Sequence, residues 1–253
     1  MSYALLISQN NIANIEVGYE TKLISDSLNR DKVTVMDFTL IANNSQSLYY
    51  NKEAKDFYDH LLGKKKPTQE NVIVTSAGSV PKYPKYNGSV FKDNEKVIVS
   101  LPVGKYIFNF DEPKLKWEIL QETKNIKNFK CQLAKTIADN GDTFFAWFTN
   151  DIPINEGPFR FKGLTGLILE VYNKNKTITI TALDIKKSNE IIEPIHYLNS
   201  VNAKSKKQYL EARNNFIENP AIYNGNIRIF DANGNETTKG ISERLKKINV
   251  FLD

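Results

Sequence analysis

Three carboxylates in the middle of the chain are the residues whose types could support hydrolysis. Asp151, Glu156 and Glu170 all fall within the stretch 143–173. Glycoside hydrolysis uses two such carboxylates, one as the acid and the other as the base or nucleophile. Any β-rich protein can offer a similar group, and nothing in the spacing fixes how far apart these three lie. A hydrolase that uses carboxylates near this stretch is therefore an alternative function.

Nucleophilic and metal chemistry have fewer candidate residues. The chain has one cysteine, Cys131, and two histidines, His60 and His196. A thiol nucleophile needs a neighbouring base, whereas Cys131 lies in a predicted strand, where an inert buried thiol is usual. One cysteine also excludes an intramolecular disulfide, and so few nitrogen and sulfur ligands argue against a transition-metal site. We expect no catalytic residue here, no metal ligand and no cofactor.

Aromatic residues make the same stretch a candidate binding site. Residues 143–173 hold one of the two tryptophans and five of the fourteen phenylalanines. Ligand sites are concave, largely aromatic, and carry a few polar groups, so a curved sheet could present these rings around a groove with two cations at its rim. The candidate ligand- or partner-binding residues are Trp147, Phe148, Phe159, Arg160, Phe161, Lys162 and Leu164. The alternative is a connection that packs in the core, which aromatic residues beside glycines more often indicate.

Glycine and proline punctuate this stretch. Gly157-Pro158 interrupts any strand, because proline donates no backbone hydrogen bond to a sheet. Gly163 and Gly166 bracket two residues at a point where a tight turn or a close backbone approach needs a residue without a Cβ. We interpret Gly157, Pro158, Gly163 and Gly166 as structural turn residues.

The order of these motifs resembles a known family. Gly163-Leu164-Thr165-Gly166-Leu167-Ile168 follows Ala146-Trp147-Phe148-Thr149 and Gly157-Pro158. Upstream lie Trp117-Glu118-Ile119-Leu120 and Cys131-Gln132-Leu133-Ala134. Together they resemble the GLPGLI family, exported proteins of Bacteroidota that are named for this hexapeptide. Thr165 stands where the family name has proline, so a role that depends on the fixed φ of proline is in doubt here.

The resemblance implies where in the cell the protein is located more than which activity it has. Members of the family are exported, which places this chain in the periplasm or in association with the outer membrane. The family has no established enzymatic activity, so the resemblance favours a non-enzymatic protein of the cell envelope. Its expected role is binding or scaffolding of a ligand or partner segment, which could be another envelope protein.

The N-terminus fits export in part. Residues 3–9 form a short apolar run that resembles the end of a signal peptide, without the basic region that should precede it. We interpret residues 1–9 as the remnant of a signal peptide, and an apolar first strand is the alternative. Residues 10–253 then form a single β-rich domain.

Local patterns predict a mainly β fold. Short segments rich in aromatic and β-branched residues recur about every ten residues, separated by turn residues, which indicates a large curved antiparallel sheet or a partly closed barrel of hairpins. Asn140-Gly141 suits a two-residue type I′ hairpin turn. Helical spacing of apolar residues predicts a short helix near 52–62 and a second near 202–218.

The composition argues against several classes of protein. The net charge of +5 comes from lysines scattered along the chain rather than clustered on a recognisable module, so we expect no nucleic-acid partner. No run approaches the roughly 20 apolar residues of a membrane-spanning helix, and an apolar fraction of 41% suffices for a substantial core. The sequence does not indicate an oligomeric state.

Overall fold

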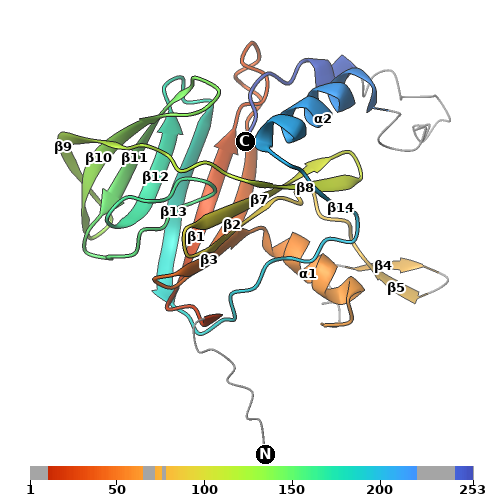
Figure 1. The fold of residues 1–253 in the computed structure, drawn as a ribbon, viewed down its shortest axis with the longest axis horizontal. Helices are drawn as coiled ribbons and strands as arrows, with labels where there is room; N and C mark the ends of the chain where they lie inside the picture. The colour runs from red at the N-terminus through yellow and green to blue at the C-terminus, as the bar shows by residue number, and fades with distance from the viewer. Residues whose placement is uncertain (1–10, 65–71, 76–77, 221–242, 253) are drawn as a thin grey trace, which may run out of the picture.

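A computed structural model describes residues 11–64, 72–75, 78–220 and 243–252 (Figure 1). The segment interpreted as a signal-peptide remnant, residues 1–9, lies outside these described residues. The fold class is the one expected: the protein is mainly β, built on one large curved sheet that carries short helices. A helix at each of the two expected positions is confirmed.

Twelve strands form the main sheet, and its order is almost entirely that of successive hairpins. From edge to edge it runs β14-β8-β7-β6-β3-β2-β1-β13-β12-β11-β10-β9. Every pairing is antiparallel except that of β14 with β8. The strands are β1 (Ile15–Leu23), β2 (Thr34–Ala42), β3 (Gln46–Tyr50), β6 (Ser89–Asp93), β7 (Lys96–Val103), β8 (Tyr106–Asp111), β9 (Glu118–Ile126), β10 (Phe129–Ile137), β11 (Thr143–Thr149), β12 (Leu167–Asn173), β13 (Ile178–Lys187) and β14 (Ser200–Asn202).

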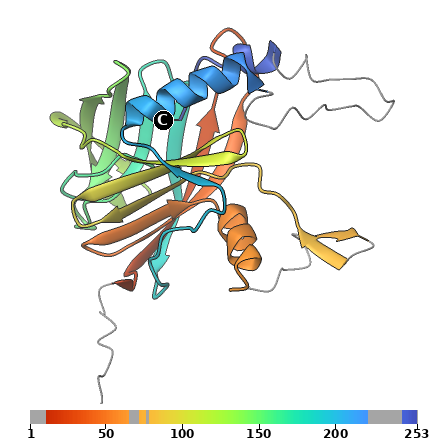
Figure 2. The ribbon, with the colours of Figure 1, turned by 45° about the vertical axis from the view of Figure 1, so that its right-hand side comes forward.

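The sheet curls without closing. Its two edge strands, β14 and β9, do not pair with each other, so the open curved sheet is the correct form and the partly closed barrel is not. Figure 2 shows the half that carries β9–β13 set at an angle to the half that carries β6–β8. One hydrophobic cluster spans both halves, because it includes Phe110 of β8 and Phe148 of β11. A separate two-stranded sheet, formed by β4 (Val72–Thr75) and β5 (Gly78–Pro81), projects beside the main sheet.

The helices lie on opposite sides of the sheet (Figures 1 and 2). Helix α1 (Lys52–Leu61) begins after Asn51, whose side chain accepts a hydrogen bond from the backbone of Ala54 at 3.1 Å. It packs Tyr58 into a second, smaller cluster on the outer face. Helix α2 (Lys206–Glu218) starts a few residues later than expected, because Ser205 provides its N-cap.

Helix α2 is attached to the inner side of the sheet by an aromatic contact. Its Tyr209 stacks on Phe110 of β8 with ring centroids 4.8 Å apart. The smaller cluster under α1 and the larger cluster under α2 therefore cover the two faces of the central strands, which explains why β2 is buried at every position from Phe38 to Ala42.

The hairpin at Asn140-Gly141 lies where it was expected, but the turn type is wrong. The backbone N–H of Ala138 donates to Asp142 O at 2.8 Å, and that of Gly141 donates to Ala138 O at 2.9 Å. Only Gly141 has a positive φ, +83°, so a three-residue loop with glycine in the left-handed region replaces the type I′ turn. The longer loop brings the carboxylate of Asp139, which is 40% exposed, within 2.9 Å of Arg160.

Residues 150–166, here called the central loop, join β11 to β12 and fill the inside of the curled sheet. The loop is anchored to its own ends, since Leu167 N donates to Ile152 O at 3.0 Å and Ile168 N to Glu156 O at 3.0 Å. Phe159 within it has a positive φ of 51°, a conformation that bulky residues rarely adopt. The surrounding contacts must hold this strained backbone in place.

The structural interpretation of the glycines agrees with the geometry. Gly163 has a φ of +92°, which only glycine adopts without strain. A Cβ on Gly166 would overlap the carbonyl oxygen of Thr149. It would also lie 2.6 Å from the carbonyl carbon of Thr149 and 3.0 Å from the Cα of Asn150. A Cβ on Gly157 would meet Phe161 O and the side chain of Ile168. At Gly157 and Gly166, the missing Cβ therefore lets another segment of backbone pass close by.

We predict that Gly166→Val destabilises the protein by at least about 1–3 kcal/mol, because the new side chain meets backbone that cannot move away. For a chain of this size that lowers Tm by roughly 2–4 °C per kcal/mol. The matched control is Thr165→Ala, which removes only an exposed hydrogen bond from Thr165 Oγ1 to Asn150 Oδ1. Thermal melts in which Gly166→Val behaves like the parent would contradict the close approach.

Candidate functional site

The aromatic residues proposed to line a groove lie in the core instead. Phe148, Phe159, Phe161 and Leu164 are each at most 2% exposed. Phe161 packs against Phe144 with centroids 4.8 Å apart. The open aromatic groove is therefore wrong for this fold, and these four residues adopt the alternative role of a packed connection. They are hydrophobic side chains that the central loop carries inward, and burial is their favourable environment.

Trp147 lies apart from this group. Successive side chains of a strand point to opposite faces of a sheet, so Trp147 and Phe148 cannot line one groove. Trp147 is 9% exposed. The ammonium of Lys124 lies 4.5 Å from its ring centroid and pairs with Glu170 at 2.7 Å. This cation–π contact covers the ring, so the tryptophan contributes mainly to packing.

Arg160 and Lys162 are also buried, not at a rim. Their residue exposures are 3% and 7%. Buried charges are costly unless each is paired with an opposite charge and hydrogen-bonded. The structure meets that condition with two ion networks, one around Glu156 and one around Glu112.

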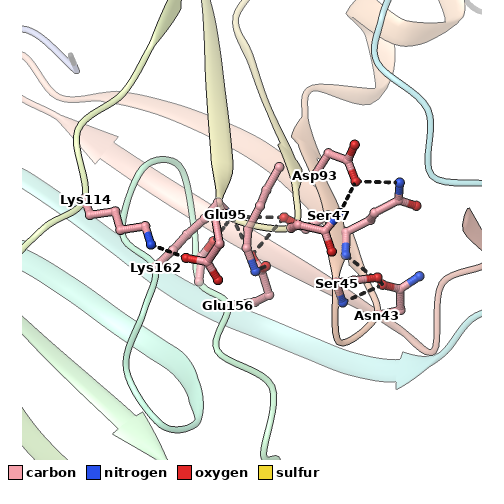
Figure 3. A network of polar contacts seen from close by, with 12 residues as sticks. Asn43, Ser45, Ser47, Asp93, Glu95, Lys114, Glu156 and Lys162 are labelled. Atoms are coloured by element: carbon pink, nitrogen blue, oxygen red, sulfur yellow. Dashed lines mark hydrogen bonds and ion pairs between the residues drawn. The ribbon is translucent and has the colours of Figure 1, made fainter. Parts of the chain in front are cut away.

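The first network surrounds Glu156, which has no solvent exposure (Figure 3). Its Oε2 accepts hydrogen bonds from Lys162 Nζ at 2.6 Å and from Ser47 Oγ at 2.8 Å. Its Oε1 accepts from Lys92 Nζ at 2.7 Å. Lys162 Nζ also donates to Ser47 Oγ and to the carbonyl of Gly157, at 3.2 and 3.3 Å. The network links the central loop to β3 and β6.

The surroundings shift the pKa values of both Glu156 and Lys162. Burial acts to raise the pKa of Glu156, but Lys162 and Lys92 outweigh it, and the pKa lies below the usual value of 4.5. Burial lowers the pKa of Lys162 below 10.5 even though Glu156 opposes this, and the nearby Lys92 adds to the lowering. Glu156 is therefore an ionised carboxylate at neutral pH, held by two ammonium groups.

The second network joins the other side of the central loop to three separate elements. Arg160 Nη1 donates to Glu112 Oε1 at 2.8 Å and to Asp139 Oδ1 at 2.9 Å. Lys206 Nζ, at the start of α2, donates to Glu112 Oε1 at 3.0 Å and lies 2.9 Å from Asp139 Oδ2. The guanidinium also lies about 6 Å from the ring centroid of Phe144.

Asp139 is the member of this network whose ionisation is most clearly shifted. Burial acts to raise its pKa, but hydrogen bonds from Lys206 and Arg160 lower it to about 2. The carboxylate, which projects from the hairpin turn between β10 and β11, is thus kept ionised by cations from the central loop and α2. The second network ties that turn to both elements.

Most partners in the two networks gave no signal in the sequence. Lys92, Glu112 and Asp139 are ordinary charged residues at strand ends and turns, and they meet Glu156 and Arg160 only through the curl of the sheet. Asp139 could have been placed near an interior only if the three-residue turn had been recognised. The central loop was the correct region, but its charged residues rather than its rings contact distant elements.

A cavity of about 270 Å³ opens beside both networks. It lies between the β6–β7 turn, residues 112–115 after β8, and the central loop. The side chains of Lys92, Glu112, Arg160 and Lys162 form its buried part, and Lys114 pairs with Glu95 at its mouth (Figure 3).

The carboxylates suggested for hydrolysis have three different environments. Asp151 is exposed, Glu156 is fully buried among lysines, and Glu170 pairs with Lys124. Cys131 is 1% exposed and burial raises the pKa of its thiol, which is the opposite of activation. Within the described ranges, no group of three or more His, Cys, Asp or Glu residues could hold a metal ion.

None of the helices in the described part of the chain has both the length and the apolarity to cross a bilayer.

Comparison with known proteins gives one family. The sequence model described as "N-glycanase peptide, N-terminal domain" matches residues 67–210, more than half of the chain. No curated protein sequence matches this chain. The GLPGLI resemblance is neither supported nor contradicted by these matches.

Solved structures of PNGF-II in two crystal forms are similar to this chain. One aligns with 79% of it at 17% identity and a TM-score of 0.51, and covers 33% of the PNGF-II chain. The other aligns with 79% at 16% identity and a TM-score of 0.49, and covers 32%. This chain thus spans about a third of the protein it matches, and identity at this level establishes a shared fold alone.

We predict that Glu156→Gln destabilises the protein by about 3–5 kcal/mol, because it leaves Lys162 buried without a charged partner. Urea unfolding should show the loss as a lower midpoint. Glu20→Gln, which breaks an exposed pair with Lys22, serves as the control and should change stability by less than about 1 kcal/mol. In the double variant with Lys162→Met, losses that simply add would show that the two side chains do not interact.

Stability should also depend on acid pH. Because the folded pKa values of Asp139 and Glu156 lie below their usual values, the unfolded chain binds more protons, and stability falls as the pH drops. The loss should begin near pH 4.5 and continue toward pH 2. Asp139→Asn should flatten the lower part of this decline. An unchanged acid profile in Asp139→Asn would argue against the ion pairs with Arg160 and Lys206.

Proposed function

This chain belongs to the family of the N-glycanase peptide N-terminal domain, and from that premise we propose that it is a non-enzymatic binding module for glycan-bearing material of the cell envelope. The link to glycans comes from the name of the family and is carried here as part of the proposal. Export to the periplasm or outer membrane belongs to it too, and is supported by the GLPGLI resemblance of residues 163–168.

The observation that carries the proposal is the pairing of the interior charges. Both carboxylate oxygens of Glu156 are held by lysines, at 2.6 Å from Lys162 and 2.7 Å from Lys92, so this carboxylate is not free to act as a general acid or base on a bound substrate. A catalytic carboxylate pair needs one group that can be protonated near neutral pH, and the lowered pKa of Glu156 opposes this. A cavity rimmed by charged side chains is suited to holding a polar ligand instead.

The rival function, a hydrolase with carboxylates near the central loop, gains no support from the residues described. Of its three candidate carboxylates, Glu156 is fully buried, Glu170 pairs with Lys124, and Asp151 is exposed. We therefore place the chain's role in recognition, either of a glycan directly or of a partner that carries one.

Purified protein should retain glycans without cleaving them. Incubation with an N-glycosylated glycopeptide should release no free glycan by mass spectrometry, while an array of neutral and acidic envelope glycans should show retention of at least one class. Release of glycan would overturn the non-enzymatic proposal, and no retention would overturn glycan recognition. Cell fractionation tests export: the protein should be recovered with the envelope, and recovery in the cytosol would contradict it.

A further inference from the structure

The cavity beside the central loop has a charged interior that folding alone does not neutralise. Among the described residues of the two networks, four cations face three carboxylates, which leaves one excess positive charge. The cations are Lys92, Arg160, Lys162 and Lys206, and the carboxylates are Glu112, Asp139 and Glu156. Lys114 and Glu95 at the mouth balance each other. An uncompensated buried cation is costly, so a site that carries one is suited to an anion.

The buried hydrogen-bonding groups without a partner match the donors and acceptors of a hydroxylated anion. Within the described chain, Nε and Nη2 of Arg160 and Oε2 of Glu112 are buried without a hydrogen-bond partner. Nε and Nη2 form one edge of the guanidinium, whose two parallel N–H groups fit the two oxygens of a carboxylate. Glu112 Oε2 can accept a hydrogen bond from a hydroxyl group. In native proteins such unsatisfied groups are rare enough to require an explanation.

Both side chains line the cavity, and a third donor lies beside them. Lys92 Nζ donates to Glu156 Oε1 and is left with further N–H groups, while Asn155 adds an exposed amide at the rim. Solvent does not reach the unpaired atoms of Arg160 and Glu112 directly. A ligand would therefore reach these atoms only after a small shift of the side chains around them.

We propose that this cavity binds a small hydroxylated organic anion with one carboxylate, of the class of an acidic monosaccharide. The carboxylate would face Arg160 and Lys92, and a hydroxyl would donate to Glu112. One excess charge matches a monoanion better than a phosphate dianion, and about 270 Å³ admits a single sugar unit, not a chain. The sugar class rests on the proposed function, whereas the anion site rests on the geometry.

The lowered pKa of Lys162 also favours an anionic ligand. Burial and the nearby Lys92 hold the pKa of Lys162 below its usual value. A bound carboxylate would offset this lowering, so ligand binding should weaken at alkaline pH where Lys162 loses its proton. A neutral sugar held by hydroxyl contacts alone would not show that dependence.

The full chain should be titrated by calorimetry with D-glucuronate, D-glucose and inorganic sulfate in chloride buffer. We expect D-glucuronate to bind and to raise Tm, and D-glucose, which has the same ring without the carboxylate, to bind at least tenfold more weakly. Equal binding of D-glucose, binding of sulfate as tight as that of D-glucuronate, or no binding of D-glucuronate would each overturn the proposal.

Two variants locate the site. Arg160→Lys keeps the positive charge but removes the Nε/Nη2 edge, and Asn155→Phe obstructs the mouth without altering either ion network. Each should weaken D-glucuronate binding at least tenfold, and Asn155→Phe should do so with an unchanged melt. The control Lys22→Met, an exposed lysine on β1, should bind like the parent. Unaltered binding in folded Asn155→Phe would overturn the placement.

The proposed function and this site can fail separately. If glycans are retained on the array but D-glucuronate does not compete and Asn155→Phe has no effect, the cavity is not the glycan site and this inference fails alone. If the protein releases glycans yet binds D-glucuronate through Arg160, then the non-enzymatic function fails while the anion site stands.

Discussion

A carboxylate without solvent exposure must be neutralised inside the fold, and the interior of this protein is arranged around that requirement. Glu156 accepts hydrogen bonds from Lys162, Lys92 and Ser47, which come from the central loop, β6 and β3. Removing any one charged partner would leave another charge buried, so these elements must fold together. The contacts specify where the central loop lies more than they add net stability, since desolvation offsets much of the attraction between the charges.

The same logic explains how an open sheet keeps its curvature. Among the described strands, β14 and β9 form the edges of the sheet and do not pair with each other, so no ladder of hydrogen bonds between them closes it. The interior instead contains the central loop, whose Phe161 packs in the core and whose Arg160 pairs with Glu112 after β8 and Asp139 of the β10–β11 turn. Apolar burial supplies most of the favourable free energy, while the ion pairs fix which parts of the two halves face each other.

Local patterns predicted the elements well because hairpins and helix caps are encoded over a few residues. A short helix was predicted near 52–62, and α1 covers Lys52–Leu61 after its N-cap Asn51. The contents of the site could not be predicted this way. Phe159 to Lys162 alternates aromatic and charged residues, which is typical of a strand with one face in solvent. The positive φ of Phe159 breaks that alternation, and the curl of the sheet then brings in Glu112, 48 residues away in sequence from Arg160.

Similarity of fold does not by itself account for the charged interior. A shared fold at 17% identity can be maintained by apolar packing and turn glycines alone. A purely structural connection would be expected to use hydrophobic residues at positions 156, 160 and 162, because well-packed apolar groups are often at least as stabilising as a buried ion pair. The chain instead retains three charged side chains there, with an excess cation and an unpaired guanidinium edge beside a cavity. The ion pairs account for the position of the central loop, whereas the excess cation and the unpaired edge are the features that the proposed anion site would explain.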